Sequence, residues 1–173
     1  MNIDLIAADV SLKPVIQNLA RFYVYELSKY DTNDNRSAIP ENGLYEAYDK
    51  YFHFDDYWND PTRFPFIIRV NKELAGFVLI NKEGTVPKVD WCMAEFFIIS
   101  KFQGKGVGRE VALKILNKFS GIWEIRQMLL NKPAINFWHS IVNAYTKGNF
   151  NKSVQTISYP EPHDMIVLTF MSN

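Results

Sequence analysis

The feature that most constrains the fold is the segment at residues 96–109, which reads FFIISKFQGKGVGR. An apolar, strand-forming run leads into a basic turn with glycines at 104, 106 and 108, and a helical pattern follows at once. Glycine lets a ligand approach the backbone closely. The first amides of a helix are free donors, and the helix dipole favours anions there. The sequence therefore predicts a phosphate-binding turn between a strand and a helix.

The apolar periodicity on both sides of this turn predicts a mixed α/β domain. Strands are expected at residues 2–8, 64–70, 74–80, 89–99, 122–130, 154–159 and 165–171. Helices are expected from Ser11 and Pro14 to Leu27, and at residues 44–52, 107–119 and 133–145. Because most strands are joined by hairpin turns, the sheet should be largely antiparallel. No repeat or change of composition marks a boundary, so residues 1–173 are expected to form a single domain.

Composition excludes several functional classes. The formal net charge is zero, from 19 basic and 19 acidic side chains, so a nucleic-acid or anionic-membrane partner is not expected. The single cysteine, Cys92, rules out an internal disulfide, and His53, His139 and His163 lack ligand spacing, so no metal site is expected. No apolar run reaches the roughly 18 residues of a membrane span, and the N-terminus lacks a signal-peptide pattern. These features predict a cytoplasmic protein.

Two common nucleotide-binding motifs fail to match the glycine turn. A P-loop needs lysine and then serine or threonine after its last glycine, whereas Arg109 and Glu110 follow Gly108. A Rossmann fingerprint follows the first strand of a repeated βαβ array, whereas this turn lies in mid-chain after hairpins. Neither reading explains the turn.

The pattern that fits is Gln103-x-x-Gly106-x-Gly108 between an apolar strand and an amphipathic helix. Here the chain resembles the GNAT superfamily of acetyl-CoA-dependent N-acetyltransferases, whose pyrophosphate loop reads Gln/Arg-x-x-Gly-x-Gly/Ala. A second family motif, Asn-x-x-Ala-x-x-apolar-aromatic, matches residues 131–138, NKPAINFW. The resemblance covers essentially the whole chain. It implies a GNAT fold with a mixed, mostly antiparallel sheet of six to seven strands flanked by about four helices.

The resemblance also implies acetyl-CoA as co-substrate, with no metal. Backbone amides of residues 104–109 would bind the pyrophosphate, with added charge from Lys105 and Arg109. The edge of the preceding strand would hold the pantetheine arm, and an amide near Ile98 would polarise the thioester carbonyl. Phe137 is as well explained by packing in the core as by contact with the adenine end. The implied cofactor-binding residues are Phe96, Phe97, Ile98, Gln103, Gly104, Lys105, Gly106, Val107, Gly108, Arg109, Asn131 and Phe137.

Glu95 is the best candidate for the catalytic base. It interrupts an apolar run, where an unpaired carboxylate is costly unless it faces a cleft. Several members of the family place an acidic residue three positions before the residue that matches Ile98. Strict alternation would put Glu95 and Ile98 on opposite faces, so this role depends on a local bulge. A salt-bridged or solvent-facing strand carboxylate is the alternative.

The general acid is where the chain departs from the family. Many members have tyrosine at the position of Trp138, and an indole N–H does not ionise usefully. Tyr145, two turns further along the helix, would lie roughly 10 Å away. The thiolate would then leave without a dedicated acid. Cys92 as a nucleophile would predict an acyl-enzyme, but a buried cysteine is usually an inert packing group.

The acceptor is expected to bind beside the first helices. Tyrosines crowd this region, and together with Glu26, Asp55 and Asp56 they could bind a cationic amine. Packing of the helices on the sheet accounts equally well for any one aromatic residue. The tyrosines and other aromatic residues concerned are Tyr23, Tyr25, Tyr30, Tyr45, Tyr48, Tyr51, Phe52, Tyr57 and Trp58.

The predicted function is transfer of an acetyl group from acetyl-CoA to a primary amine, by direct attack in a ternary complex. The partner is a small-molecule amine or a peptide amine of unassigned identity, and a homodimer is compatible with the sequence. Since Trp138 replaces the family tyrosine, a non-catalytic acyl-CoA-binding or regulatory module is the alternative. A third reading, a nucleotide-binding protein, predicts competition by ATP or NAD.

Overall fold

The computed structural model describes residues 1–31, 39, 41–43, 45, 54–158 and 162–172. The strands are β1 (Ile3–Ala7), β2 (Phe64–Val70), β3 (Glu73–Asn81), β4 (Trp91–Ile98), β5 (Gly121–Met128), β6 (Asn151–Ile157) and β7 (His163–Ser172). The helices are α1 (Lys13–Ser28), α2 (Asp56–Asn59), α3 (Val107–Lys118) and α4 (Lys132–Thr146), with short 3-10 turns at Val10–Leu12 and Ser100–Phe102. The helix expected at residues 44–52 lies, except for Tyr45, outside the described residues.

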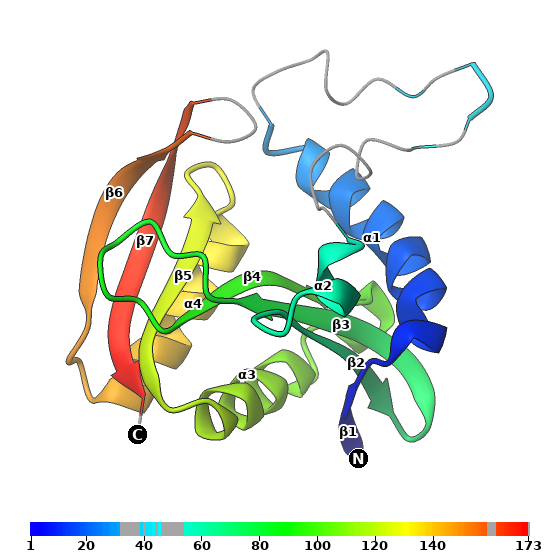
Figure 1. The fold of residues 1–173 in the computed structure, drawn as a ribbon, viewed down its shortest axis with the longest axis horizontal. Helices are drawn as coiled ribbons and strands as arrows, with labels where there is room; N and C mark the ends of the chain where they lie inside the picture. The colour runs from blue at the N-terminus through cyan, green and yellow to red at the C-terminus, as the bar shows by residue number, and fades with distance from the viewer. Residues whose placement is uncertain (32–38, 40, 44, 46–53, 159–161, 173) are drawn as a thin grey trace.

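One seven-stranded sheet runs through the molecule in the order β1-β2-β3-β4-β5-β7-β6 (Figure 1). Its strand pairs are antiparallel except for β4 and β5, which run parallel. The mostly antiparallel α/β fold expected from the sequence is therefore confirmed. The β4–β5 ladder is short, because its pairs run only from Trp91 with Trp123 to Met93 with Ile125. Beyond those pairs the two strands separate.

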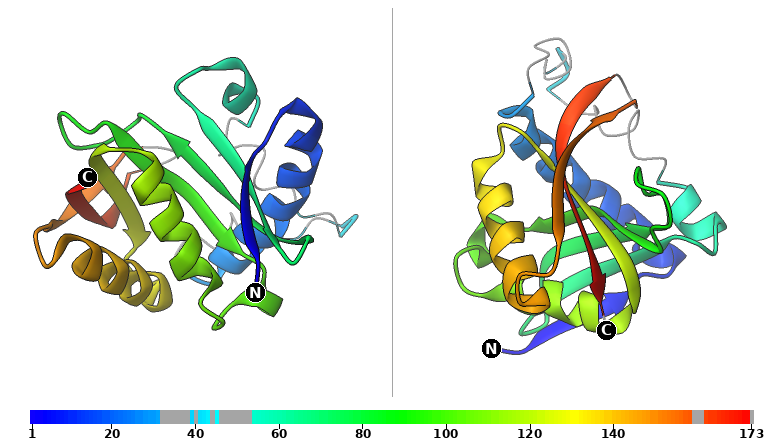
Figure 2. Two further views of the ribbon diagram at one scale, coloured as in Figure 1. Left: turned by 90° about the horizontal axis from the view of Figure 1, so that it is seen from below. Right: turned by 90° about the vertical axis from the view of Figure 1, so that its left-hand side faces the viewer.

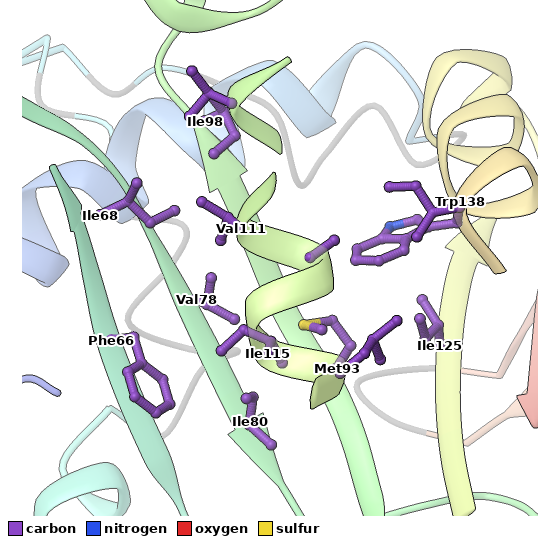
Figure 3. Packing of buried hydrophobic residues seen from close by; sticks show 14 of the residues in the cluster. Phe66, Ile68, Val78, Ile80, Met93, Ile98, Val111, Ile115, Ile125 and Trp138 are labelled. Atoms are coloured by element: carbon purple, nitrogen blue, oxygen red, sulfur yellow. The ribbon is translucent and has the colours of Figure 1, made fainter. Parts of the chain in front are cut away.

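The helices cover both faces of the sheet (Figure 2). One face carries α3 and α4, whose Val111, Ile115 and Trp138 pack on the sheet (Figure 3). The other face carries α1 and α2, whose Ile16 and Tyr57 are buried there in a second cluster. The three long helices α1, α3 and α4 each bury one apolar stripe, as an amphipathic helix on a sheet must. Strands β2, β3 and β4 contribute side chains to both cores, and β4 leads into the glycine turn.

A β-bulge in β4 changes which side chains face each core. Leu79 of β3 pairs with Glu95 and the next residue, Ile80, pairs with Met93, so Ala94 is the extra residue. A bulge reverses the alternation of side chains downstream of it. Met93 before the bulge lies in the α3–α4 core, and Phe97 after it lies in the α1–α2 core.

Candidate active site

A cleft of about 1130 Å³ opens where β4 and β5 separate. It is lined from β4 by Glu95 and Phe96, from β5 by Arg126, from α1 by Tyr23 and from α4 by Trp138. The cleft therefore draws on elements from both faces of the sheet. Strand separation creates it, because a continuous β4–β5 ladder would close the gap.

The predicted phosphate-binding turn leads directly into α3. Gly104 and Gly106 have φ of 69° and 81°, and Gly106 is the N-cap of α3. A Cβ at either position would meet no atom within 4 Å, so the backbone conformation, not crowding, calls for glycine. At Gly108 the reason is contact, because a Cβ there would lie 3.2 Å from the Phe137 ring. Val107 is buried and anchors the start of the helix.

Basic and backbone donors gather at this turn. Lys105 and Arg109 are exposed, and the first amides of α3 lack partners within the helix. The N-cap residue is glycine, so these amides receive no hydrogen bond from a capping side chain. This donor set, with the helix dipole, fits a pyrophosphate group.

Gln103 joins the turn to the end of β4. Its Nε2 donates to the carbonyl oxygen of Ile98 at 2.7 Å. In the structure its side-chain amide therefore fixes the turn relative to the strand, a role that the motif alone did not reveal.

The exposed edge of β4 offers main-chain groups to the cleft. Ile99 N donates to Ala75 O of the β2–β3 hairpin at 2.8 Å. Since main-chain groups of a strand alternate in direction, those of Phe97 point toward β3, whereas those of Phe96 and Ile98 point toward the side of β5. Of the three residues expected to bind the pantetheine arm, Phe96 and Ile98 thus have the appropriate main-chain direction.

The start of α4 forms the opposite wall. Asn131 lines the cleft and caps the helix, because its Oδ1 accepts a hydrogen bond from Ala134 N at 3.1 Å. Phe137 and Trp138 pack against Phe96, with ring centroids 5.7 and 5.0 Å apart. The Trp138 indole points from α4 toward the space between β4 and β5 (Figure 3).

Tyr145 lies away from the cleft. Its hydroxyl donates toward Leu116 O and Asn117 Oδ1, at 3.3 and 3.1 Å, and so joins α4 to α3. This contact makes Tyr145 part of the packing between α3 and α4.

Glu95 lies in the cleft on the face of α1. The bulge at Ala94 puts it on the same face as Phe97, and strict alternation resumes beyond it, so Ile98 faces the other core. The catalytic reading needed a bulge between Glu95 and Ile98, but the bulge lies before Glu95, and the two residues remain on opposite faces. Burial raises the pKa of the Glu95 carboxyl to about 7, against a hydrogen bond from Tyr23 and the charge of Arg126, which lower it.

A buried charge network on β5 was missed from the sequence. Glu124 is fully buried and accepts hydrogen bonds from the amides of Thr85 and Val86 at 2.8 and 2.9 Å. Arg126, two residues on, lies 3.5 Å from Glu124 and donates to Cys92 Sγ at 3.1 Å. The sequence did contain a signal for this network, namely two opposite charges at alternate positions of an apolar strand.

Cys92 is fully buried in this network. Burial raises the pKa of its thiol to about 11, against the lowering effect of Arg126. A buried thiol of this kind is a poor nucleophile. The geometry favours the packing role for Cys92.

Of the three acidic residues expected near the acceptor, only Asp56 lines the cleft. Glu26 accepts a hydrogen bond from Ser100 Oγ, and Asp55 pairs with Lys13; neither lines the cleft. Carboxyl groups do line it, together with tyrosines that come mainly from the α1–α2 side. The carboxyl groups are those of Asp31, Asp56, Glu83, Glu95 and Asp164, and the tyrosines are Tyr23, Tyr30, Tyr45 and Tyr57.

Within the described part of the chain, no three histidine, cysteine or acidic side chains are grouped so as to hold a metal ion. No helix among the described residues is both long and apolar enough to cross a membrane.

Comparison with known proteins agrees with this geometry. The sequence matches the model of the Acetyltransferase (GNAT) family over residues 26–141, which include the glycine turn and most of α4. No match was found among curated protein sequences.

Solved structures share the fold across nearly the full chain. The ribosomal-protein-S18-alanine N-acetyltransferase of Escherichia coli is 13% identical with a TM-score of 0.60, covering 99% of this chain and 95% of that one. The yncA protein of Salmonella typhimurium, solved with its cofactor acetyl-CoA, is 11% identical with a TM-score of 0.62, covering 100% and 95%. A spermidine N-acetyltransferase SpeG chimera from Vibrio cholerae and hSSAT is 12% identical with a TM-score of 0.61, covering 99% and 96%.

The family match spans most of the chain, and it includes the glycine turn, strands β4 and β5, and the start of α4. This chain belongs to the GNAT family of acetyltransferases.

Proposed function

We propose that the protein transfers an acetyl group from acetyl-CoA to a primary amine by direct attack in a ternary complex. The observation that carries this proposal is the position of Glu95. Its carboxyl group, with a pKa of about 7, lies in a cleft that begins where β4 separates from β5. A base with a pKa near the working pH is well suited to accept a proton from an ammonium group.

The residues of the turn fit the cofactor. Backbone amides of residues 104–109 are proposed to bind the pyrophosphate, and the exposed Lys105 and Arg109 would add charge-assisted contacts. Acetyl-CoA supplies an activated thioester, so the protein needs only to bind, orient and exchange protons.

The arm of the cofactor is proposed to run along the exposed edge of β4. Phe96 and Ile98 would offer main-chain groups to it, and the Ile98 amide would donate to the thioester carbonyl. The Ile98 carbonyl already accepts from Gln103, which leaves the amide of Ile98 as its contribution. Asn131 at the start of α4 would contact the arm from the other wall.

Phe137 is proposed to face the cofactor from beside Gly108, because its ring borders the turn at the N-terminus of α3. The same ring packs on Phe96 and Trp138, so it also belongs to the packing of α4.

Glu95 is proposed to be the catalytic base. An alkyl ammonium with a pKa near ~10 must lose a proton before it attacks. The carboxylate on the α1 face of β4 can take that proton directly or through one water. Thiolate departure needs no strong acid, since a thiol pKa of about 8.5 makes it a good leaving group at neutral pH.

The acceptor is proposed to be a cationic amine that enters from the side of α1 and α2. Among the described residues, five carboxyl side chains line the cleft against two guanidinium groups, those of Arg63 and Arg126. Both arginines already pair with carboxylates, Arg63 with Glu83 at 2.6 Å and Arg126 with Glu124 at 3.5 Å. The excess of carboxyl over guanidinium groups in this lining, together with the tyrosine rings, favours a positively charged acceptor.

A panel of amines tests the proposal through release of free thiol from acetyl-CoA. The wild-type protein should release thiol with at least one cationic amine, and Glu95→Gln should lower kcat by about 100-fold or more while coenzyme A still binds. Glu73→Gln is the matched control, because Glu73 pairs with Lys101 on the surface.

Trp138, in place of a phenol, favours one alternative, a non-catalytic acyl-CoA-binding module. That alternative predicts binding of coenzyme A without thiol release for every amine. Identical rates for Glu95→Gln and the wild type would instead show that Glu95 is not the catalytic base.

A further inference from the structure

The group that fixes Glu95 lies on α1, and three observations point to it. The bulge at Ala94 turns the Glu95 side chain toward the α1 face of the sheet. On α1, Tyr23 lines the same cleft and donates a hydrogen bond to the Glu95 carboxyl. The carboxyl and the phenol therefore meet because two distant segments pack across the α1–α2 core.

The Tyr23 ring is held by its neighbours. It contacts Phe77 edge to face, with ring centroids 5.7 Å apart and planes at 90°, and it contacts Phe97 at 5.6 Å. Phe77 and Phe97 are both buried and belong to adjacent, paired strands. A ring packed in this way directs its hydroxyl with little rotational freedom, which lowers the entropy cost of the hydrogen bond.

Other ionisable groups near Glu95 come from three further elements. They are Tyr57 of α2, Arg126 of β5 and Cys92 of β4 itself, and each interacts with the Glu95 charge over a distance. The Tyr57 hydroxyl accepts from Asn81 Nδ2 at 3.3 Å, and Arg126 donates to Cys92. Of these neighbours, Tyr23 is the one whose hydrogen bond lowers the pKa of Glu95.

We propose that Tyr23 is a positioning residue whose hydroxyl orients the Glu95 carboxylate toward the cleft. Its use in catalysis rests on the proposed role of Glu95 as base. Burial, and then the charge of Glu95, raise the pKa of Tyr23 well above its usual value, so the phenol stays a donor. A hydrogen bond to the charged form of a carboxyl group stabilises that form.

Tyr23→Phe tests this proposal, because it removes the hydroxyl and keeps the ring. The Glu95 carboxyl is titrated by NMR with ¹³C-labelled glutamate, and its resonance is assigned by its loss in Glu95→Gln. We expect the pKa of Glu95 to rise in Tyr23→Phe. Tyr145→Phe is the matched control, because it removes a hydroxyl that joins α4 to α3, and it should leave the titration unchanged.

The rate profile gives the second measurement. Tyr23→Phe should lower kcat/KM about tenfold at about pH 6 and little at about pH 9, since losing about 1.4 kcal/mol of stabilisation of the carboxylate lowers its ionised fraction tenfold. A purely structural role would lower the rate equally at every pH.

The outcomes separate this inference from the proposed function. An unchanged Glu95 titration in Tyr23→Phe overturns the inference, whatever the enzyme does with amines. A raised pKa without any acetyl transfer by the wild type supports the Tyr23–Glu95 contact and refutes the proposed function alone. If Tyr23→Phe does not fold, ¹³Cζ-labelled tyrosine in the wild type replaces it. The Tyr23 resonance should then move as Glu95 titrates and stay still in Glu95→Gln; no movement in the wild type overturns the inference.

Discussion

Replacing Glu95 by glutamine should stabilise the protein at alkaline pH, even though it removes the proposed base. The pKa of Glu95 rises from its usual 4.5 to about 7, mainly because of burial. A group whose pKa is raised by folding contributes stability below its unfolded pKa and loses it as pH rises through the folded pKa. The wild-type protein should therefore lose stability between about pH 4.5 and about pH 7 through this group.

The magnitude follows from the two pKa values. At 1.36 kcal/mol for each tenfold step, ionising Glu95 in its cleft costs at most about 3 kcal/mol. Glutamine keeps the shape and can still accept from Tyr23, but its amide also loses hydration. We expect Glu95→Gln to be more stable than the wild type by about 2 kcal/mol at about pH 8, and nearly equal to it at about pH 5.

Urea unfolding followed by tryptophan fluorescence measures this difference at both pH values. Glu73→Gln serves as the control, because Glu73 is 53% exposed in its pair with Lys101 and a surface pair contributes little. The same stability difference at both pH values, or a less stable Glu95→Gln at about pH 8, would refute the electrostatic reasoning.

Three further predictions concern the turn and the buried thiol. Gly106→Ala should lower the free energy of unfolding in urea by about 1–2 kcal/mol, because a φ of 81° is strained for any residue with a Cβ. The substitution should also weaken the binding of coenzyme A, measured by calorimetry. Unchanged stability would contradict this prediction. Gln103→Ala should raise the Kd for coenzyme A about tenfold, since the turn loses its hydrogen bond to Ile98, and an unaltered Kd would show that the bond does not position the turn. Cys92→Ala should keep acetyl transfer, and the wild-type thiol should react slowly with iodoacetamide at about pH 8 because its pKa is about 11; loss of transfer would instead favour an acyl-enzyme.

Much of the fold could be predicted from the sequence because its signals are local. The seven strands lie where apolar alternation and turn residues predicted them, with ends differing by a few residues. For example, the strand expected at 89–99 is Trp91–Ile98, and the helix expected from Pro133 begins at Lys132. The short helix Asp56–Asn59 was not expected, because a single turn carries too little periodicity to be detected.

For the candidate site too, the sequence indicated the features that depend on local signals and missed the contacts between distant residues. The sequence indicated Glu95 and the turn, but not the partners that give them their properties. Tyr23 is 72 positions from Glu95 along the chain, and Gln103 contacts a main-chain carbonyl, which no residue type can reveal. Glu26 and Asp55 were expected near the acceptor and instead pair elsewhere, with Ser100 and Lys13.

By itself, the sequence determined the glycine turn and the helix that follows it. A glycine-rich turn and the free amides at a helix start depend on neighbouring residues only, so residues 103–109 were sufficient to predict them. Tertiary structure alone decided where Glu95 points. The bulge at Ala94 is a property of the pairing between β4 and β3, and the cleft exists because β5 leaves β4 after Met93. Both depend on contacts between segments far apart in the chain, and those contacts turn an acidic residue in an apolar strand into the proposed base.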